Sequence, residues 1–327
     1  MKKPSTTMVI ASSSRFILCL WRQLLLVVLV LAGVPTAGLA ADDAASSATH
    51  TVIILHNNDL HFSFTCVDKI AETVQHFRDT YADVLLFNAG DFSIRRDRWE
   101  GKKIVTNAEQ YTERLQFMVA TMNRLGYDAV VPGNHDLGYE GTITRDYLKK
   151  MKFPVLGANV VVNTDNYITP QPFISRKLNS GLRLTVLGLC GGGFKADGVK
   201  LSSAQQAFTK YESLRDGCDL FVLLTHIGVS ADRALADKYG DKIDAIVGGH
   251  THTMLNPPEL RNGVLIGQAR DGYGRPTYLG AMRLIFDAAG KCIEKEGEVL
   301  EFKDGRLVKP SRFLEGSPAG STVKRAA

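Results

Sequence analysis

Five short polar motifs follow apolar runs between residues 59 and 252 of this 327-residue chain. In chain order they are Asp59-x-His61, Gly90-Asp91, Gly133-Asn134-His135-Asp136, Thr225-His226 and Gly249-His250-Thr251-His252. They bring together carboxylates, an amide oxygen and five imidazoles, and the chain has only eight histidines in all. Oxygen and imidazole donors in this number suit two divalent metal ions better than one. The motifs therefore predict a dinuclear metal site.

The first two motifs supply carboxylates. Alternate side chains of an extended segment point the same way, so Asp59 and His61 are expected to bind one metal from one side. Asp91 follows Gly90, which permits a sharp turn after the apolar run 84–88. Its two oxygens could bridge cations roughly 3.5–4 Å apart. Each motif alone is also an ordinary turn sequence, and its place in the series favours the metal interpretation.

The later motifs supply neutral donors at Asn134, His226, His250 and His252. His226 ends the apolar run 220–224, and a glycine pair precedes the His-x-His motif. Two histidines spaced in this way in an extended segment can serve two neighbouring metals. Outside the motifs, His56 is expected to support Asp59 from beneath, as polar side chains around metal ligands commonly do.

Strands must deliver these motifs to one rim of the fold. Apolar runs predict strands over 51–55, 84–88, 128–131, 154–158, 182–189, 220–225, 245–247 and 264–267. Apolar residues at helical spacing predict helices around 67–77, 115–125, 204–214 and 231–239. Two further runs, 279–286 and 292–302, flank a turn and predict a hairpin. Strands that alternate with helices indicate an α/β layered fold.

The order of the motifs and the residues in them resemble those of the calcineurin-like metallophosphoesterase superfamily. Residues 55–61 (Leu-His-Asn-Asn-Asp-Leu-His) and the GNHD and GGHTH blocks are most similar to the catalytic domain of 5′-nucleotidases, and the resemblance covers roughly residues 51–300. It implies two stacked mixed sheets flanked by helices, a four-layer α/β/β/α sandwich. It also implies hydrolysis of phosphate esters, with nucleotides among the candidate substrates.

The resemblance assigns ligands to two ions. The first would be held by Asp59, His61, Asp91 and His252, and the second by Asp91, Asn134, His226 and His250. The donor set suits Zn, Mn, Fe or Co without selecting one. In such sites a metal-bridging hydroxide attacks phosphorus.

His135 would be the imidazole that stabilises phosphoryl charge and helps to protonate the leaving oxygen. In the family an aspartate three positions later orients this histidine, and this chain has Gly138 there. Asp136, the adjacent acid, is the expected substitute, and an acid from elsewhere in the chain is the alternative.

The first forty residues read as a secretory signal peptide. Four basic residues precede or border an apolar run at 24–31, and Ala40 ends a small-residue sequence suited to cleavage. An uncleaved anchor is the alternative. We expect a flexible leader at 41–50, a metallophosphoesterase domain at 51–310 and a disordered tail at 311–327. Without the signal, basic and acidic residues nearly balance, which argues against a nucleic-acid-binding protein.

The expected location is the periplasm or the extracellular medium. Export permits disulfides among Cys66, Cys190, Cys218 and Cys292, and buried free thiols are the equal alternative. Only about 25 residues follow Phe302, so the C-terminal nucleotide-binding domain of periplasmic 5′-nucleotidases is expected to be absent.

Two other functions compete with the proposed enzyme, which would act on a small phosphorylated substrate. One is an exported protein that binds a metal or a phosphorylated ligand without catalysis, and the other is a thiosulfate-ester hydrolase. Because all seven metal positions are filled, the sequence favours the phosphoesterase.

Overall fold

The computed structural model describes residues 49–94, 98–99, 102–103, 107–137, 141–193, 196–270 and 277–315. They all belong to a unit that spans Ser46–Ala327. The expected signal peptide at 1–40, nearly all of the leader and the end of the tail lie outside the described residues. Within the described part of the chain, no helix is long and apolar enough to cross a membrane.

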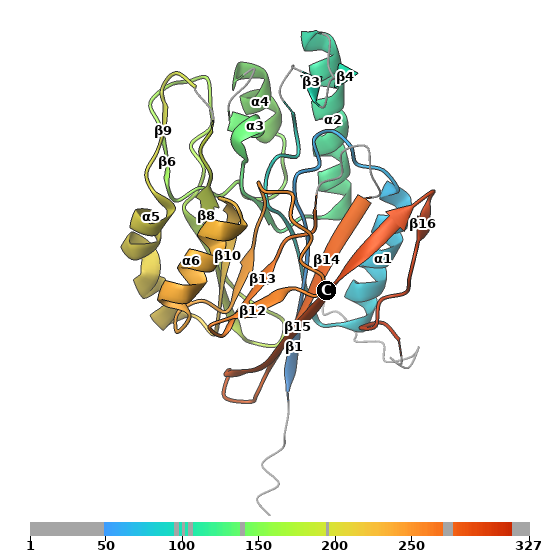
Figure 1. The fold of residues 1–327 in the computed structure, drawn as a ribbon, viewed down its shortest axis with the longest axis vertical. Coiled ribbons are helices and arrows are strands. Elements are labelled where there is room, and N and C mark those ends of the chain that lie inside the picture. Colours follow the sequence, from blue (N-terminus) through green and yellow to red (C-terminus); the bar gives the residue numbers. More distant parts are fainter. Residues whose placement is uncertain are drawn as a thin grey trace, which may run out of the picture. The chain divides into compact units, whose positions relative to one another are not determined.

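Two six-stranded mixed sheets form the centre of the molecule (Figure 1). The first has the order β16-β15-β14-β1-β2-β5, with β1 at His50–Asn57, β2 at Asp83–Asn88, β5 at Ala129–Val130, β14 at Thr277–Phe286, β15 at Cys292–Lys303 and β16 at Arg306–Leu307. Strands β1, β2 and β5 run parallel, while β14 joins β1 antiparallel and forms the predicted hairpin with β15. Parallel strands place the ends of β1, β2 and β5 at one rim.

The second sheet has the order β12-β13-β11-β10-β8-β7, with β7 at Phe173–Lys177, β8 at Arg183–Cys190, β10 at Leu220–His226, β11 at Ala245–Val247, β12 at Glu259–Arg261 and β13 at Val264–Gly267. Its four inner strands are parallel and the two edge strands are antiparallel. Two short ribbons stand apart from the sheets, with β3 (Arg98–Trp99) against β4 (Lys102–Lys103) and β6 (Val160–Val162) against β9 (Val199–Leu201).

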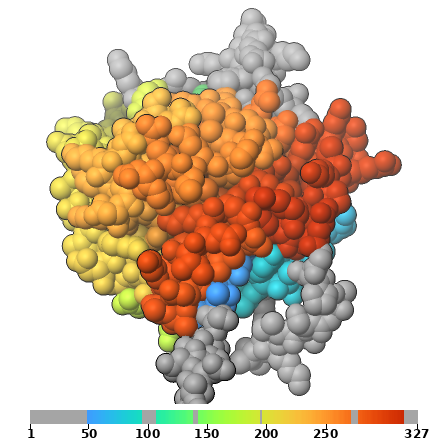
Figure 2. Space-filling view, turned by 60° about the horizontal axis from the view of Figure 1, so that its bottom comes forward, coloured from blue at the N-terminus to red at the C-terminus, as the bar shows by residue number. Residues whose placement is uncertain are grey.

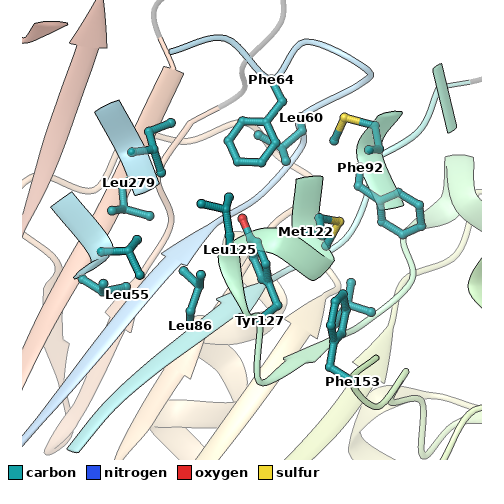
Figure 3. Close-up of a cluster of buried hydrophobic side chains, with 14 of the residues drawn as sticks. Leu55, Leu60, Phe64, Leu86, Phe92, Met122, Leu125, Tyr127, Phe153 and Leu279 are labelled. Carbon is teal, nitrogen blue, oxygen red and sulfur yellow. The ribbon is translucent and has the colours of Figure 1, made fainter. Parts of the chain in front are cut away.

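Side-chain alternation along the strands builds the layers. In β1, Ile53 and Leu55 face a cluster with α1 (Val67–Thr80) and α2 (Ala108–Leu125), whereas Val52 and Ile54 face the other sheet. Figure 3 shows Leu55 and Leu86 of the first sheet packed beneath Met122 and Leu125. Strand β10 repeats the pattern, with its other face packed on α5 (Ala204–Tyr211) and α6 (Val229–Tyr239). The predicted four-layer α/β/β/α sandwich is confirmed.

Several local predictions differ from the structure. Residues 154–158 make only isolated bridges, from Val155 to Val130 and from Leu156 to Gln171. The helix expected at 204–214 ends at Tyr211 and continues as a 3₁₀ helix, η1, over Glu212–Gly217. Two short helices follow β5, namely α3 (Asn134–Leu137) and α4 (Gly141–Leu148), and neither was predicted.

The packed part of the chain extends past residue 310, where the tail was expected to begin. Phe313 is 4% exposed and joins the cluster around α1, and its carbonyl accepts a hydrogen bond from the Tyr81 hydroxyl at 2.6 Å. The guanidinium groups of Arg283 and Arg312 lie 5.1 and 4.8 Å from the centre of its ring. These contacts anchor residues 311–315 to the domain.

The four cysteines from Cys66 onward are free thiols in the structure. Cys190 and Cys218 are buried, and burial raises the pKa of both thiols. Cys292 is half-buried, and its pKa is raised to about 11 mainly by desolvation. All three are therefore protonated and unreactive at neutral pH, which agrees with the free-thiol alternative.

Candidate metal centre

The candidate ligands lie just beyond the carboxyl ends of parallel strands from both sheets. Asp59 and His61 follow β1, Asp91 follows β2, and His226 is the last residue of β10. The remaining ligands follow β5 and β11, at Asn134, His250 and His252. Loops at this end of parallel strands are the usual place for binding groups in α/β folds.

The backbone at five of these seven positions is left-handed, not extended as the sequence suggested. Positive φ angles occur at Asp59 (50°), His61 (47°), Asp91 (52°), His250 (80°) and His252 (53°). Non-glycine residues seldom adopt this conformation, and such strain gathers at functional sites where the surroundings enforce it. The expectation that strand alternation aligns these pairs is therefore wrong. Tight loops align them instead.

Backbone hydrogen bonds join two of these loops. The Asp59 N–H donates to the Gly90 carbonyl and the His61 N–H to the Asp91 carbonyl, both at 2.9 Å. The first two motifs are thus parts of one backbone structure, and their side chains reach the same space.

Three imidazoles converge on Asp59. Its Oδ1 atom lies 3.8 Å from Nε2 of His61, 3.9 Å from Nε2 of His226 and 3.3 Å from Nε2 of His252. The His61 and His252 Nε2 atoms are themselves only 3.2 Å apart. Asp59 Oδ1 is fully buried and has no hydrogen-bond partner in the described part of the chain. A bare carboxylate oxygen among imidazole nitrogens is an arrangement that a cation would stabilise.

A second group of donors surrounds His226. Its Nε2 atom lies 3.1 Å from Asp91 Oδ2 and 3.3 Å from Asn134 Oδ1. The same Asn134 oxygen is 2.9 Å from Nδ1 of His250. Asp91 thus lies between the two groups, as a bridging ligand would. The donor types and their convergence fit divalent metal ions. Three groups of donors have ligand atoms within 4.8 Å of one another, namely Asp59 with His61 and His252, Asp59 with Asp91 and His226, and Asp91 with His61 and His135.

Hydrogen bonds fix two of the imidazole rings. His226 contacts the Ala89 carbonyl through Nδ1 at 2.6 Å, and His61 contacts the Ser93 carbonyl through Nδ1 at 3.3 Å. When Nδ1–H donates to these carbonyls, the lone pair of each Nε2 faces the centre. This is how histidine ligands of metals are usually held.

Electrostatics at the centre also favour a cation. Burial lowers the pKa of His226, but the charges of Asp91 and Asp59 outweigh it and bring the pKa to about 10. The nearby imidazoles His226, His61 and His135 hold the pKa of Asp91 below its usual range, although burial opposes this. The buried carboxylates thus retain a proton on His226 when no metal is bound. A metal ion would take the place of that charge.

His135 lies on the rim. Its side chain is 14% exposed, and its Nε2 atom is 4.0 Å from Asp91 Oδ2. Its backbone N–H donates to Asp91 Oδ1 at 2.9 Å, which fixes the start of α3 beside that carboxylate. The ring also contacts the His61 ring edge-on, at 5.0 Å between centroids. Ligand atoms of His135, His61 and Asp91 all lie within 4.8 Å of one another.

Asp136 is buried beneath the loop. Its carboxylate accepts hydrogen bonds from the backbone N–H groups of Asp91 (2.8 Å), Ser93 (2.9 Å) and Gly133 (2.9 Å), and from the Ser93 hydroxyl (2.6 Å). Burial and the Asp91 charge raise the pKa of Asp136 to about 7. Through these four hydrogen bonds, Asp136 holds the turn at Asp91 in place.

His56 does not lie under Asp59. Its side chain is fully buried against the backbone of Gly267 and Gly280, in the region between the sheets. Neither ring nitrogen has a hydrogen-bond partner among the described residues, and burial lowers its pKa to about 4. His56 is therefore a neutral core residue, and the expected supporting role is not seen.

Asn58 holds Asp59 in the way that His56 was expected to. Its Nδ2 atom donates to Asp59 Oδ2 at 2.6 Å, and the His250 N–H donates to the same oxygen at 2.9 Å. Both contacts leave Oδ1 for the centre. Gln268, just after β13, was also missed, and a polar residue at the carboxyl end of a parallel strand was the signal available for it.

The sequence profile of the calcineurin-like phosphoesterase family matches residues 53–254. The chain belongs to this family. Snake venom 5′-nucleotidase from Naja atra is 30% identical over 297 residues, covering 75% of this chain and 52% of that protein. The chain spans about half the length of these curated relatives.

Two solved structures share the fold. The 5′-nucleotidase precursor from Thermus thermophilus superposes with a TM-score of 0.62 at 23% identity, over 77% of this chain and 54% of that one. The calcineurin-like phosphoesterase YfkN from Bacillus subtilis superposes with a TM-score of 0.60 at 19% identity, over 82% of this chain and 95% of that one. The family fold thus accounts for the two sheets that carry the candidate centre.

Proposed function

We propose that this protein is an exported dinuclear-metal phosphoesterase that hydrolyses small phosphate esters. The observation that carries the proposal is the buried Asp59 Oδ1 atom, which faces three imidazoles and has no hydrogen-bond partner among the described residues. Two divalent cations, when bound, would activate water and neutralise charge on the phosphate. The identity of the ions is left open by the donors, which suit Zn, Mn, Fe or Co.

The protein's own groups would have distinct roles. Asp91 would help to hold both ions, and Asp59, Asn134 and the histidines His61, His226, His250 and His252 would supply the remaining ligands. His135, on the rim, would stabilise charge on the phosphoryl oxygens and donate a proton to the leaving oxygen. Asp136 would act on His135 indirectly, by holding the turn to which the His135 backbone is bonded.

Nucleotides are the first substrates to test, because the similar proteins include 5′-nucleotidases from snake venom and cattle. Those relatives are about twice as long as the matched region, so the proposal is strongest for phosphate-ester hydrolysis in general. Purified protein should be stripped with a chelator, reloaded with single metals and assayed with an aryl phosphate. It should then be assayed with a panel of phosphorylated metabolites.

We expect activity to disappear with the chelator and to return with a divalent metal, and elemental analysis to find two ions per chain. Metal binding without turnover of any phosphate ester would favour the non-catalytic alternative. Turnover of a thiosulfate ester, without turnover of any phosphate ester, would favour a thiosulfate-ester hydrolase. Full activity in strong chelator with no bound metal would refute the dinuclear proposal.

Export is the second part of the proposal, and it is supported by the apolar run at 24–31 and by Ala40. Expression of the full chain should give mature protein that begins at Ala41 in the exported soluble fraction. Mass spectrometry that finds residues 1–40 intact on membrane-bound protein would support an uncleaved anchor.

A further inference from the structure

Gln268 is a fully buried amide that makes all its observed side-chain hydrogen bonds to one loop. Its Nε2 donates to the Gly249 carbonyl at 2.9 Å, and its Oε1 accepts from the Thr251 hydroxyl at 2.9 Å and the Thr253 N–H at 2.6 Å. Burying an amide without partners is costly, whereas a fully bonded amide fixes what it bonds to. One side chain thus spans the loop from residue 249 to residue 253.

That loop needs support. His250 and His252 have φ angles of 80° and 53°, so two non-glycine residues in one short segment adopt the left-handed conformation. Such residues persist only where the surrounding structure enforces the conformation. Both also carry ring nitrogens toward the centre, where a small change in backbone angle would move them away from their partners.

The loop also fixes a third ligand. The His250 N–H donates to Asp59 Oδ2, and the Ala269 N–H, next to Gln268, donates to Asn58 Oδ1 at 2.8 Å. Asn58 in turn bonds Asp59 Oδ2. The segment after β13 therefore holds ligands from both sheets. It contacts the His-x-His loop through the Gln268 side chain and through the Arg270 N–H, which donates to the Thr253 carbonyl at 3.0 Å.

We propose that Gln268 is a positioning residue of the metal centre, which holds the 249–253 loop so that His250 and His252 face the two ions. The proposal rests on the proposed function, because it assumes that these histidines bind metal. Gln268 itself does not face the ions. It acts through the backbone and through Thr251.

The test is metal affinity, measured separately from activity. Chelator-treated full-length protein should be titrated with Mn²⁺ by calorimetry, for the wild type and for Gln268→Met, which keeps the length of the side chain but removes all of its hydrogen bonds. We expect Gln268→Met to bind Mn²⁺ about 10–100-fold more weakly, the usual cost of losing a partner that orients metal ligands.

Asn159→Leu is the matched control. Asn159 is 2% exposed and also makes three side-chain hydrogen bonds, all of them to backbone, at Cys190 N–H, Cys190 C=O and Ser202 C=O. It should lower the melting temperature of metal-free protein about as much as Gln268→Met does, while Mn²⁺ affinity is unchanged. Thr251→Val, at an exposed position, removes one Gln268 contact and should give a smaller loss of affinity if Gln268→Met does not fold.

The outcomes separate the two proposals. Wild-type protein that binds Mn²⁺, with Gln268→Met and Thr251→Val binding equally well, would overturn the role of Gln268 alone. Equal loss of affinity in Asn159→Leu would also overturn it, since general destabilisation would then explain the effect. Wild-type protein that binds no divalent metal would overturn both the positioning role and the proposed function.

Discussion

The Nε2 atom of His226 lies 3.1 Å from Oδ2 of Asp91, and both side chains are almost completely buried. His226 ends a strand of the second sheet, and Asp91 follows a strand of the first. The contact therefore joins the two halves of the sandwich through a pair of groups that a shared cation would stabilise. The other oxygen of Asp91, Oδ1, accepts a hydrogen bond from the His135 N–H. Asp91 therefore connects candidate ligands of both sheets to His135 on the rim.

Asp91→Asn tests this bridging position. The change removes one negative charge and one of two strong metal-binding oxygens while keeping the size of the side chain. Loss of a residue that only orients a metal ligand usually lowers metal affinity roughly 10–100-fold. Because Asp91 would bind the metal itself, we expect at least this loss of affinity, and we expect activity to be lost. Elemental analysis and turnover of an aryl phosphate provide the measurements. Asp165→Asn, at an exposed position, should change neither.

Gly133→Ala should displace the Asp91 carboxylate. A Cβ atom on Gly133 would lie 2.0 Å from Asp91 Oδ1, and space for it can come only from movement of the turn. We expect a loss of about 1–3 kcal/mol in unfolding free energy, as for other overpacked sites, together with weaker metal binding. Gly192→Ala is the control, because a Cβ there has nothing within 4 Å. Equal behaviour of the two variants would contradict the steric explanation.

His135→Ala should retain metal but lose roughly 10²–10⁴-fold in kcat, the usual range for a positioned proton-transfer group. The loss should shrink for esters with good leaving groups, because these need little protonation. Kinetics on aryl phosphates of graded leaving-group pKa measure the trend, with the exposed His76→Ala as control. A rate loss that is the same for every leaving group would point to a structural role instead.

Asp136→Asn should act on the Asp91 turn. An amide NH₂ group would face backbone N–H donors that now meet a carboxylate oxygen, and an unsatisfied buried group costs about 1–3 kcal/mol. We expect a lower unfolding free energy in chelator and weaker metal binding, with a partial loss of rate. Unchanged metal affinity combined with the leaving-group trend of His135→Ala would instead indicate that Asp136 acts on the imidazole directly.

His56 should contribute to the pH dependence of stability. Its pKa in the folded protein is about 4, below the value of 6.5 that an exposed histidine has, so below pH 6.5 the unfolded chain binds a proton that the folded chain does not. Stability is therefore lost as the pH falls from 6.5 toward 4. This amounts to roughly 2 kcal/mol between about pH 7.5 and pH 5.

Urea unfolding in chelator at the two pH values measures this loss. His56→Leu should remove that part of the pH dependence, whereas His76→Leu, at an exposed position, should keep it. An equal slope for wild type and His56→Leu would show that the folded protein protonates His56 as readily as the unfolded chain does.

The periodicity of the sequence predicted most of the sandwich. Alternation in β1 and the continuous apolar run of β10 were sufficient to identify buried strands, and Gly126 ends α2 with a φ of 67°, as expected for a helix stop. Edge strands such as β7 and β12 were missed because their residues are largely exposed and polar. These strands are held by pairing with β8 and β13, and such pairing is not visible in the composition of the strand itself.

The candidate metal ligands could be identified from the order of their motifs along the chain. The residues that hold the ligand loops in place could not. Asp136 is adjacent to His135 in sequence, yet its bonds run to Asp91 and Ser93, about 45 residues earlier. Gln268 belongs to none of the sequence motifs. Both act through backbone groups of a distant loop, and the left-handed turns that bring those groups into reach are set by tertiary contacts.

The pairing of β1 also bears on how the protein is made. This strand is the first in the chain, and its partner on one side is β14, with His50 opposite Phe286 and His56 opposite Gly280. In Figure 2 the late residues, in orange and red, cover a broad face of the molecule, and the blue and cyan residues emerge along its lower edge.

Until β14 has been synthesised, one edge of β1 is unpaired and its apolar residues, such as Ile53 and Leu55, lack their final cover. The sandwich therefore closes only after nearly the whole chain has left the ribosome. A nascent chain shorter than about 280 residues would present an open, aggregation-prone strand. The first sheet therefore stays unfinished through most of the synthesis, because β14 and β15 lie near the end of the chain.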